Sequence, residues 1–265
     1  MVDIQTRLQE HYNEALKHFK PNQIVGVFYY GSANYGLNTP YSDVDSKVIV
    51  VPTWEDLVFN RKAVSTTYHM PDSDECLDCK DIREYFKQFR KQSCNFLEIL
   101  FTEYKILNPR YADTWNILVQ QNEKIAHYDM ETAISTMIGM ATQKEHALTH
   151  LYPSKIEMID KFGYDPKQLH HILRLEEFME RYIAGFSYAD CLKSQKADYL
   201  KSVKLGEYYD LETAKSVASK AIEKMRTMEK EFIANFNASQ TYVDGLINIV
   251  QEGILHTAVL HEWED

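Results

Sequence analysis

The chain has 265 residues, of which 45% are hydrophobic and 26% charged, a balance typical of a globular protein with a sizeable core. Its formal net charge of −10 argues against a broad, nonspecific nucleic-acid-binding surface, although a local basic groove remains compatible with it. Four cysteines without a secretory leader predict a cytoplasmic protein, and the absence of an apolar run of ~20 residues argues against a membrane span.

The N-terminal part of the chain mixes helix and strand patterns. Apolar residues recur at helical spacing over residues 3–20, so we expect a helix there that ends at Pro21. β-Branched and aromatic residues between turn signals predict strands over residues 24–30, 43–51, 63–70 and 75–80, the last two as an antiparallel pair. Helices are expected over residues 54–57, 81–92 and 94–101.

A Gly-Ser bend follows the first expected strand. Gly31 has access to backbone conformations closed to other residues and lets a ligand come close to the chain, and Ser32 adds a hydroxyl donor. A short helix beginning at Asn34 would add free N–H groups that face an anion. The bend is therefore a candidate phosphate-binding loop, although a lone Gly-Ser is more often an ordinary turn.

Two carboxylates stand at the start of the second expected strand. Asp43 and Asp45 are two residues apart, so on an extended strand they share a face, roughly 6.5–7 Å apart. That spacing suits a pair of divalent metal ions about 3.5–4 Å apart. Together with the candidate phosphate loop, the pair predicts a site for a nucleoside triphosphate with two Mg²⁺ ions, with Mn²⁺ as an alternative metal.

Two-metal phosphoryl transfer requires a further carboxylate on a neighbouring strand. Alternation over residues 75–80 puts Cys76, Asp78 and Lys80 on one face, and we select Asp78 as this ligand. Asp81 and Glu75 compete with it. Asp81 is also well placed as the N-cap of the next helix, and Glu75 is expected on the opposite face.

Strand signals largely vanish beyond Pro109. Helices are expected over residues 111–121, 129–151, 154–162, 166–184, 187–203, 211–236 and 241–258. The predicted fold class is therefore α+β. A small mixed sheet flanked by helices occupies residues 1–108, and a mainly helical domain occupies residues 109–265.

One expected helix of the second domain carries a polar stripe. Lys167, His171 and Arg174 fall at i, i+4 and i+7, and Asp165 and Pro166 precede them as a plausible cap and first helical residue. Spacing alone favours a solvated helix face for the three polar residues.

The motifs resemble those of a known superfamily. Gly31-Ser32 followed by Asp43 and Asp45 is similar to the pattern of the nucleotidyltransferases typified by DNA polymerase β. The fuller stretch GSANYGLNTPYSDVDS resembles the RNA-ligase-associated branch of predicted nucleotidyltransferases, often found in bacteria and their phages. Further matching positions lie in the second half: Gly163, Tyr164, Asp165, Lys167, His171, Arg174, Leu175 and the segment Leu205-Gly206-Glu207. One departure is Ser93-Cys94-Asn95, where the family commonly has Asn-Pro-Asn.

The resemblance implies a nucleotidyltransferase that moves a nucleoside monophosphate from a triphosphate to a hydroxyl, with an RNA 3′ end as the favoured acceptor. Asp43, Asp45 and Asp78 would be the catalytic metal ligands. Nucleotide-binding roles would fall to Gly31, Ser32, Ser42, Lys167, His171 and Arg174. Three alternatives remain: a catalytically silent nucleotide-binding module, transfer to a protein or small molecule, and a metal-dependent nuclease.

Overall fold

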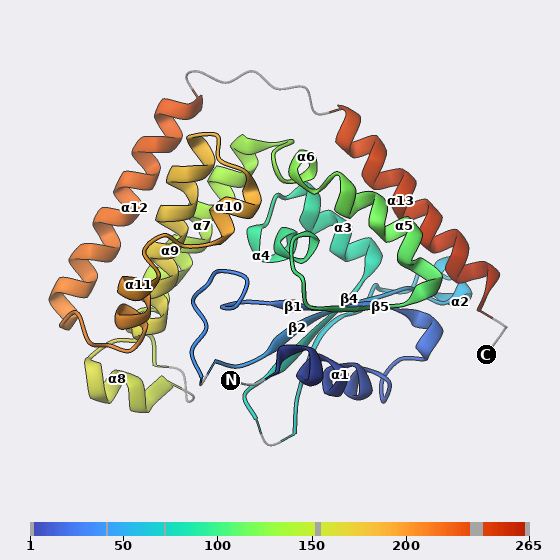
Figure 1. Ribbon diagram of the computed structural model, residues 1–265, viewed down its shortest axis with the longest axis horizontal. Coiled ribbons are helices and arrows are strands. Elements are labelled where there is room, and N and C mark those ends of the chain that lie inside the picture. The colour runs from blue at the N-terminus through green and yellow to red at the C-terminus, as the bar shows by residue number, and fades with distance from the viewer. Residues whose placement is uncertain (1–2, 41, 72, 152–154, 234–240, 263–265) are drawn as a thin grey trace. The chain divides into compact units, whose positions relative to one another are not determined.

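A five-stranded mixed sheet with the order β3-β4-β2-β1-β5 organises the N-terminal part of the chain (Figure 1). The computed structural model describes residues 3–40, 42–71, 73–151, 155–233 and 241–262. The strands are β1 (Ile24–Tyr30), β2 (Asp45–Val50), β3 (Ser65–His69), β4 (Cys76–Asp81) and β5 (Lys105–Leu107). All neighbouring strands are antiparallel except β2 and β4, which run parallel.

The two central strands are buried because helices cover both faces of the sheet. Helix α1 (Ile4–Ala15) packs on one face and buries Leu8 and His11 against β1 and β2. Helices α3 (Ile82–Arg90), α5 (Pro109–Gln120) and α13 (Thr241–Leu260) lie on the other side in Figure 1. The ring of Phe28 meets the wholly buried indole of Trp115, with ring centroids 4.9 Å apart. This burial explains why β1 and β2 read as nearly continuous apolar runs.

Short elements complete this part of the chain. They are η1 (Pro21–Gln23), α2 (Trp54–Val58), α4 (Cys94–Leu97), η2 (Glu98–Leu100) and α6 (Asn122–Ala126). Thr53 caps α2 by accepting the Asp56 N–H, and Asp81 caps α3 by accepting the Arg83 N–H.

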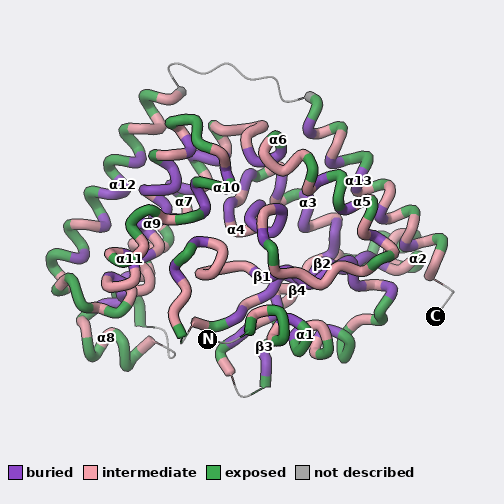
Figure 2. The backbone as a smooth tube through the Cα atoms, viewed as in Figure 1, coloured by how far each residue is buried: buried purple, intermediate pink, exposed green. Residues whose placement is uncertain are grey.

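The remaining helices pack around α9 (Pro166–Ile183), which contacts four of them. They are α7 (Met130–Ala147), α8 (Ile156–Phe162), α10 (Tyr188–Leu192), α11 (Ala197–Lys204) and α12 (Leu211–Ile233). Asp165 caps α9 by accepting the Lys167 N–H, as the sequence indicated. Helix α12 buries Ala214, Ala218 and Ile222 at helical spacing, and Figure 2 shows buried stretches recurring along it.

The predicted α+β fold class is confirmed, with a small mixed sheet flanked by helices and a helical region after it. The chain forms two compact units: residues 1–34, 38–129 and 239–265 make the first, and residues 35–37 and 130–238 make the second. These units differ from the division predicted at residues 108 and 109. Helix α5 packs on the sheet through Trp115, and α13 packs on α3 and α5. Within the described ranges, every helix is too short or too polar to cross a membrane.

Candidate active site

The Gly-Ser bend leaves β1 at its last residue. Gly31 has φ +123°, a conformation that favours glycine, so the sharp exit depends on this residue. Residues 32–36 then form turns, and the short helix expected at Asn34 is not formed. Two N–H groups of the bend have nearby acceptors: Ala33 donates to the Tyr29 hydroxyl at 2.8 Å, and Asn34 donates to the Gly31 carbonyl at 3.0 Å. Residues 32–36 therefore do not provide the helix N-terminus that would add free N–H groups for an anion.

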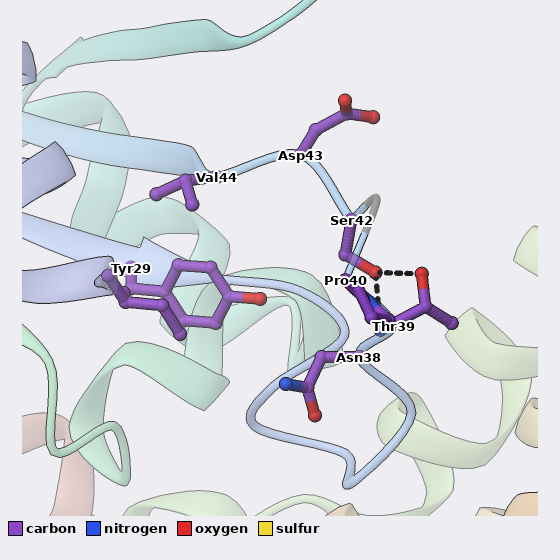
Figure 3. A pocket seen from close by; sticks show the side chains of 8 residues that line it. Tyr29, Asn38, Thr39, Pro40, Ser42, Asp43 and Val44 are labelled. Carbon is purple, nitrogen blue, oxygen red and sulfur yellow. Dashed lines mark hydrogen bonds between the residues drawn. The ribbon is translucent and has the colours of Figure 1, made fainter. Parts of the chain in front are cut away.

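The two carboxylates of the Asp-x-Asp pattern occupy different surroundings. β2 begins at Asp45, so Asp43 lies in the preceding loop, where it is exposed. Figure 3 shows the Asp43 carboxylate directed away from the Tyr29 ring. The half-buried Asp45 is fixed, because its Oδ1 accepts the Cys76 N–H at 3.0 Å and the Cys76 thiol at 3.2 Å. The prediction that both lie on one extended strand holds for Asp45 alone.

Asp78 shares a sheet face with Asp45. In the parallel pair β2–β4, Asp78 lies opposite Lys47, which is two residues beyond Asp45. The Lys47 ammonium lies 2.6 Å from Asp78 Oδ2, and the Lys80 ammonium lies 3.2 Å from Oδ1. Two lysines thus already neutralise the carboxylate selected as the further metal ligand.

Lys47 itself is almost wholly buried, with 4% of its surface exposed. Its ammonium lies 4.2 Å from the centroids of both the Tyr30 and the Phe96 rings. Aromatic faces attract a cation, so this box together with Asp78 explains how a lysine is tolerated inside the protein. The sequence pattern gave no sign of this contact.

The two competing carboxylates have other roles. Asp81, only 1% exposed, forms an ion pair with Arg83 at 2.6 Å besides capping α3. Glu75 is buried against α1 on the opposite face, where it accepts the Val44 N–H at 3.0 Å and pairs with Arg7. Although burial raises the pKa of Glu75, the Val44 N–H and the Arg7 guanidinium outweigh it and leave the pKa below its ordinary value.

The groups beside Asp45 remain protonated at neutral pH. Burial, and then the charge of Asp45, raises the pKa of the Cys76 thiol to about 11. Burial, followed by the charge of Asp45, also raises the pKa of the Tyr30 hydroxyl, which lies 3.7 Å from the Cys76 sulfur. Both groups can therefore donate hydrogen bonds here, and neither is suited to accept a proton from a substrate.

Mg²⁺ requires few protein side chains as ligands. This ion keeps several waters and is commonly bound by one or two carboxylates together with substrate phosphates. Asp43 and Asp45 fit that requirement. Across the described residues, however, no group of three His, Cys, Asp or Glu side chains is placed to hold a metal ion. The described residues therefore do not form a closed ligand set that includes Asp78, and a metal ion on Asp43 and Asp45 stays a prediction.

An open pocket adjoins the loop before β2. Its space is about 300 Å³ when the open solvent at its mouth is included. The pocket is lined by Ile4, Tyr29, Asn38, Thr39, Pro40, Ser42, Asp43 and Val44 (Figure 3). Ser42, predicted as a nucleotide-binding residue, accepts the Thr39 N–H at 2.8 Å through its Oγ. Its hydroxyl therefore stabilises the turn that leads to Asp43.

Helix α9 of the helical unit carries three predicted nucleotide-binding residues, Lys167, His171 and Arg174. Arg174 is 6% exposed and its guanidinium lies 3.9 Å from the centroid of the Tyr35 ring, so the solvated-face interpretation does not hold for it. Lys167 and His171 are partly exposed. Burial, followed by the neighbouring His170 and Arg174, holds the pKa of His171 well below its ordinary value.

Sequence reasoning missed Lys144, which joins this group from α7. The end of α7 and the start of α9 are linked, because the Asp165 N–H donates to the Leu148 carbonyl at 2.8 Å. Lys144 lies one turn before Leu148 and Lys167 lies two residues after Asp165. Burial and then Lys167 lower the pKa of Lys144. The sequence signal that could have indicated Lys144 was its position in the last turn of an expected helix that another helix follows closely.

Comparison with protein-family models finds no match, and comparison with curated proteins finds none. Among solved structures, the chain is similar to a nucleotidyltransferase-like protein from Exiguobacterium sibiricum. The identity is 12% and the TM-score 0.31, over 85% of this chain and 74% of that one. A similarity with so low a TM-score carries no argument about function.

Proposed function

We propose that this chain is a metal-dependent nucleotidyltransferase that moves a nucleoside monophosphate from a nucleoside triphosphate to an acceptor hydroxyl and releases pyrophosphate. One observation carries the proposal. Tyr30 pairs with Asp45 across β1 and β2, so the Gly31-Ser32 bend and the first carboxylate of β2 emerge together at one end of the sheet. A bend that admits a phosphate beside carboxylates that bind Mg²⁺ is the combination that nucleotidyl transfer requires.

Each residue has a defined task in this proposal. Gly31 lets the triphosphate approach the backbone, and Ser32 donates a hydrogen bond to it. Asp43 and Asp45 hold Mg²⁺, which neutralises phosphate charge and polarises the α-phosphate when bound. Asp78 becomes a ligand for a second ion only if it leaves Lys47 and Lys80.

Within the helical unit taken by itself, we propose that Lys167, His171 and Arg174 of α9 keep the predicted phosphate-binding role. Arg174 offers a planar fork of donors, and Lys167 offers a flexible ammonium. His171 is kept neutral by its lowered pKa, so it donates a single N–H group. An RNA end is the acceptor suggested by the family resemblance, and a protein side chain or a small molecule is the alternative.

A catalytically silent nucleotide-binding module is the second candidate. It is favoured by the two lysines that pair with Asp78. They leave only Asp43 and Asp45 of the three predicted ligands for metal binding, whereas two-metal transfer uses three carboxylates. Such a module would bind a nucleoside triphosphate and leave it intact. The two candidates therefore differ in one product, which is pyrophosphate.

The test incubates the protein with each α-labelled nucleoside triphosphate, Mg²⁺ and total RNA. Transfer predicts labelled RNA and released pyrophosphate, whereas the silent module predicts stoichiometric binding without pyrophosphate. Asp43→Ala and Asp45→Ala are expected to abolish transfer without unfolding the protein. The matched control is Asp113→Ala, an exposed carboxylate on α5. Full activity in Asp43→Ala would end the catalytic assignment.

A further inference from the structure

The segment that carries Asp43 and Asp45 is held by two consecutive residues, Glu75 just before β4 and Cys76 at its start. Glu75 accepts the Val44 N–H at 3.0 Å through Oε1. Cys76 donates its own N–H to Asp45 Oδ1 at 3.0 Å. The Cys76 thiol donates to the same Asp45 oxygen at 3.2 Å. Because side chains of neighbouring residues in an extended chain point to opposite faces, the Glu75 carboxylate and the Cys76 thiol contact the segment from opposite faces of the sheet.

Glu75 is held in turn by helix α1. Its Oε2 accepts from Arg7 Nε at 2.5 Å, and His11 Nε2 lies 3.6 Å from the same oxygen. His11 is wholly buried, and its Nδ1 lies 2.9 Å from the Ser46 hydroxyl. With 8% of its surface exposed, Glu75 thus has both carboxylate oxygens engaged, one by Val44 just before β2 and one by α1.

The contact with Val44 matters because β2 begins only at Asp45. Val44 precedes the ladder and is itself buried, at 2% exposure, so Glu75 supplies the acceptor that its N–H needs. The residue between the two aspartates is thereby fixed. A loop tied at its middle residue limits the positions that the carboxylates on either side can take.

We propose that Glu75 is a positioning residue that sets the Asp43–Asp45 segment for metal and nucleotide binding, and that it is not itself a metal ligand. This inference rests on the proposed function. It gives a role to the carboxylate that the sequence left in competition with Asp78.

Three substitutions at Glu75 separate this role from its alternatives. Glu75→Gln keeps an oxygen for the Val44 N–H, so near-normal Mn²⁺ affinity and kcat are expected. Glu75→Ala removes that acceptor, and a loss of about 10- to 100-fold in metal affinity or kcat is expected, the range for residues that orient metal ligands. Glu75→Asp keeps the charge but shortens the side chain, so an intermediate loss is expected, and it serves if the Ala variant does not fold. Glu103→Ala, an exposed glutamate of the same unit, is the control.

The measurements are Mn²⁺ binding by electron paramagnetic resonance, kcat and KM for the nucleoside triphosphate, and hydrogen exchange at the Val44 amide. Faster exchange at Val44 in the Ala and Asp variants, with exchange in Gln close to wild type, supports the proposal. Equal losses in Gln and Ala would show a metal ligand and overturn it. Unchanged Mn²⁺ affinity and kcat in folded Glu75→Ala would show a purely structural role and also overturn it.

A failure of the proposed function would look different. A wild-type protein that releases no pyrophosphate would remove the transfer activity, while Mn²⁺ binding and Val44 exchange would still decide the role of Glu75.

Discussion

Replacing Lys47 by methionine tests how the sheet face that carries Asp45 and Asp78 is stabilised. Removing one partner of a buried ion pair costs about 3–5 kcal/mol, because the other charge stays buried without compensation. Asp78 would keep only Lys80, whose ammonium lies 3.2 Å away and whose side chain is 17% exposed. Since this second lysine offsets part of the loss, we expect Lys47→Met to lower the free energy of unfolding by about 3 kcal/mol, the lower end of that range.

Urea denaturation of single and double variants checks this loss in the free energy of unfolding. Lys47→Met/Asp78→Leu removes both charges and is expected to lie within about 1 kcal/mol of the wild type, since apolar replacement of a buried pair is often neutral. Lys80→Met, at the more exposed lysine, should cost no more than about 1 kcal/mol. A cost below about 1 kcal/mol for Lys47→Met, or a double variant no more stable than the single one, would refute the buried-pair interpretation.

The same double variant also tests Asp78. If Asp78 only neutralises Lys47, Mn²⁺ affinity should survive in Lys47→Met/Asp78→Leu. If Asp78 is a metal ligand, the Mn²⁺ affinity should fall because the double variant lacks its carboxylate.

Three further predictions concern other parts of the chain. Burial lowers the pKa of His170 to about 4, so below pH 6.5 the unfolded state binds more protons than the folded state. The free energy of unfolding should therefore fall by about 2 kcal/mol between pH 7 and 5, and His170→Gln should reduce this fall in urea denaturation. Lys144→Ala should weaken binding of inorganic triphosphate about tenfold in calorimetry, since a charge-assisted hydrogen bond contributes about 1.5–3 kcal/mol, whereas Lys220→Ala, at an exposed position of α12, should not. Gly31→Ala should cost about 1–3 kcal/mol in unfolding free energy because of its φ of +123°, whereas Gly245→Ala in α13 should be neutral or stabilising.

Local pattern was sufficient where one segment decides its own structure. β1 runs over the predicted residues 24–30 because an apolar run is bounded by the Gly31 bend. The alternation predicted for β4 is confirmed, with Leu77 and Cys79 buried and Cys76 and Asp78 partly exposed. In both cases the burial of each side chain follows from the period of the strand.

Pairing partners were beyond the reach of local pattern. Asp43 continues the alternation of β2, yet the ladder stops at Asp45 because its partner Tyr30 is the last residue of β1. The contact of Lys47 with Asp78 depends on the parallel register of two strands distant in sequence, which no single segment encodes. The three-residue strand β5 was likewise missed, since it is defined by its pairing with β1.

One predicted helix was divided by a tertiary contact. Residues 187–203 read as a single helix, whereas the structure has α10 and α11 with a break between them. The buried Glu177 of α9 accepts the Ser194 hydroxyl at 2.6 Å and the Gln195 N–H at 2.7 Å. These bonds hold the chain in a turn there. Helix propensity alone gives no indication of an acceptor on another helix.

The placement of tryptophan lets one optical signal follow the first compact unit while another follows both units. Trp54 and Trp115 belong to the first unit, and residues 130–238 contain no tryptophan. Intrinsic fluorescence therefore follows the melting of the sheet and its covering helices, while far-ultraviolet circular dichroism also follows α7 to α12. Coincident midpoints from the two signals would mean that the units unfold together, and separated midpoints would mean that each unfolds by itself.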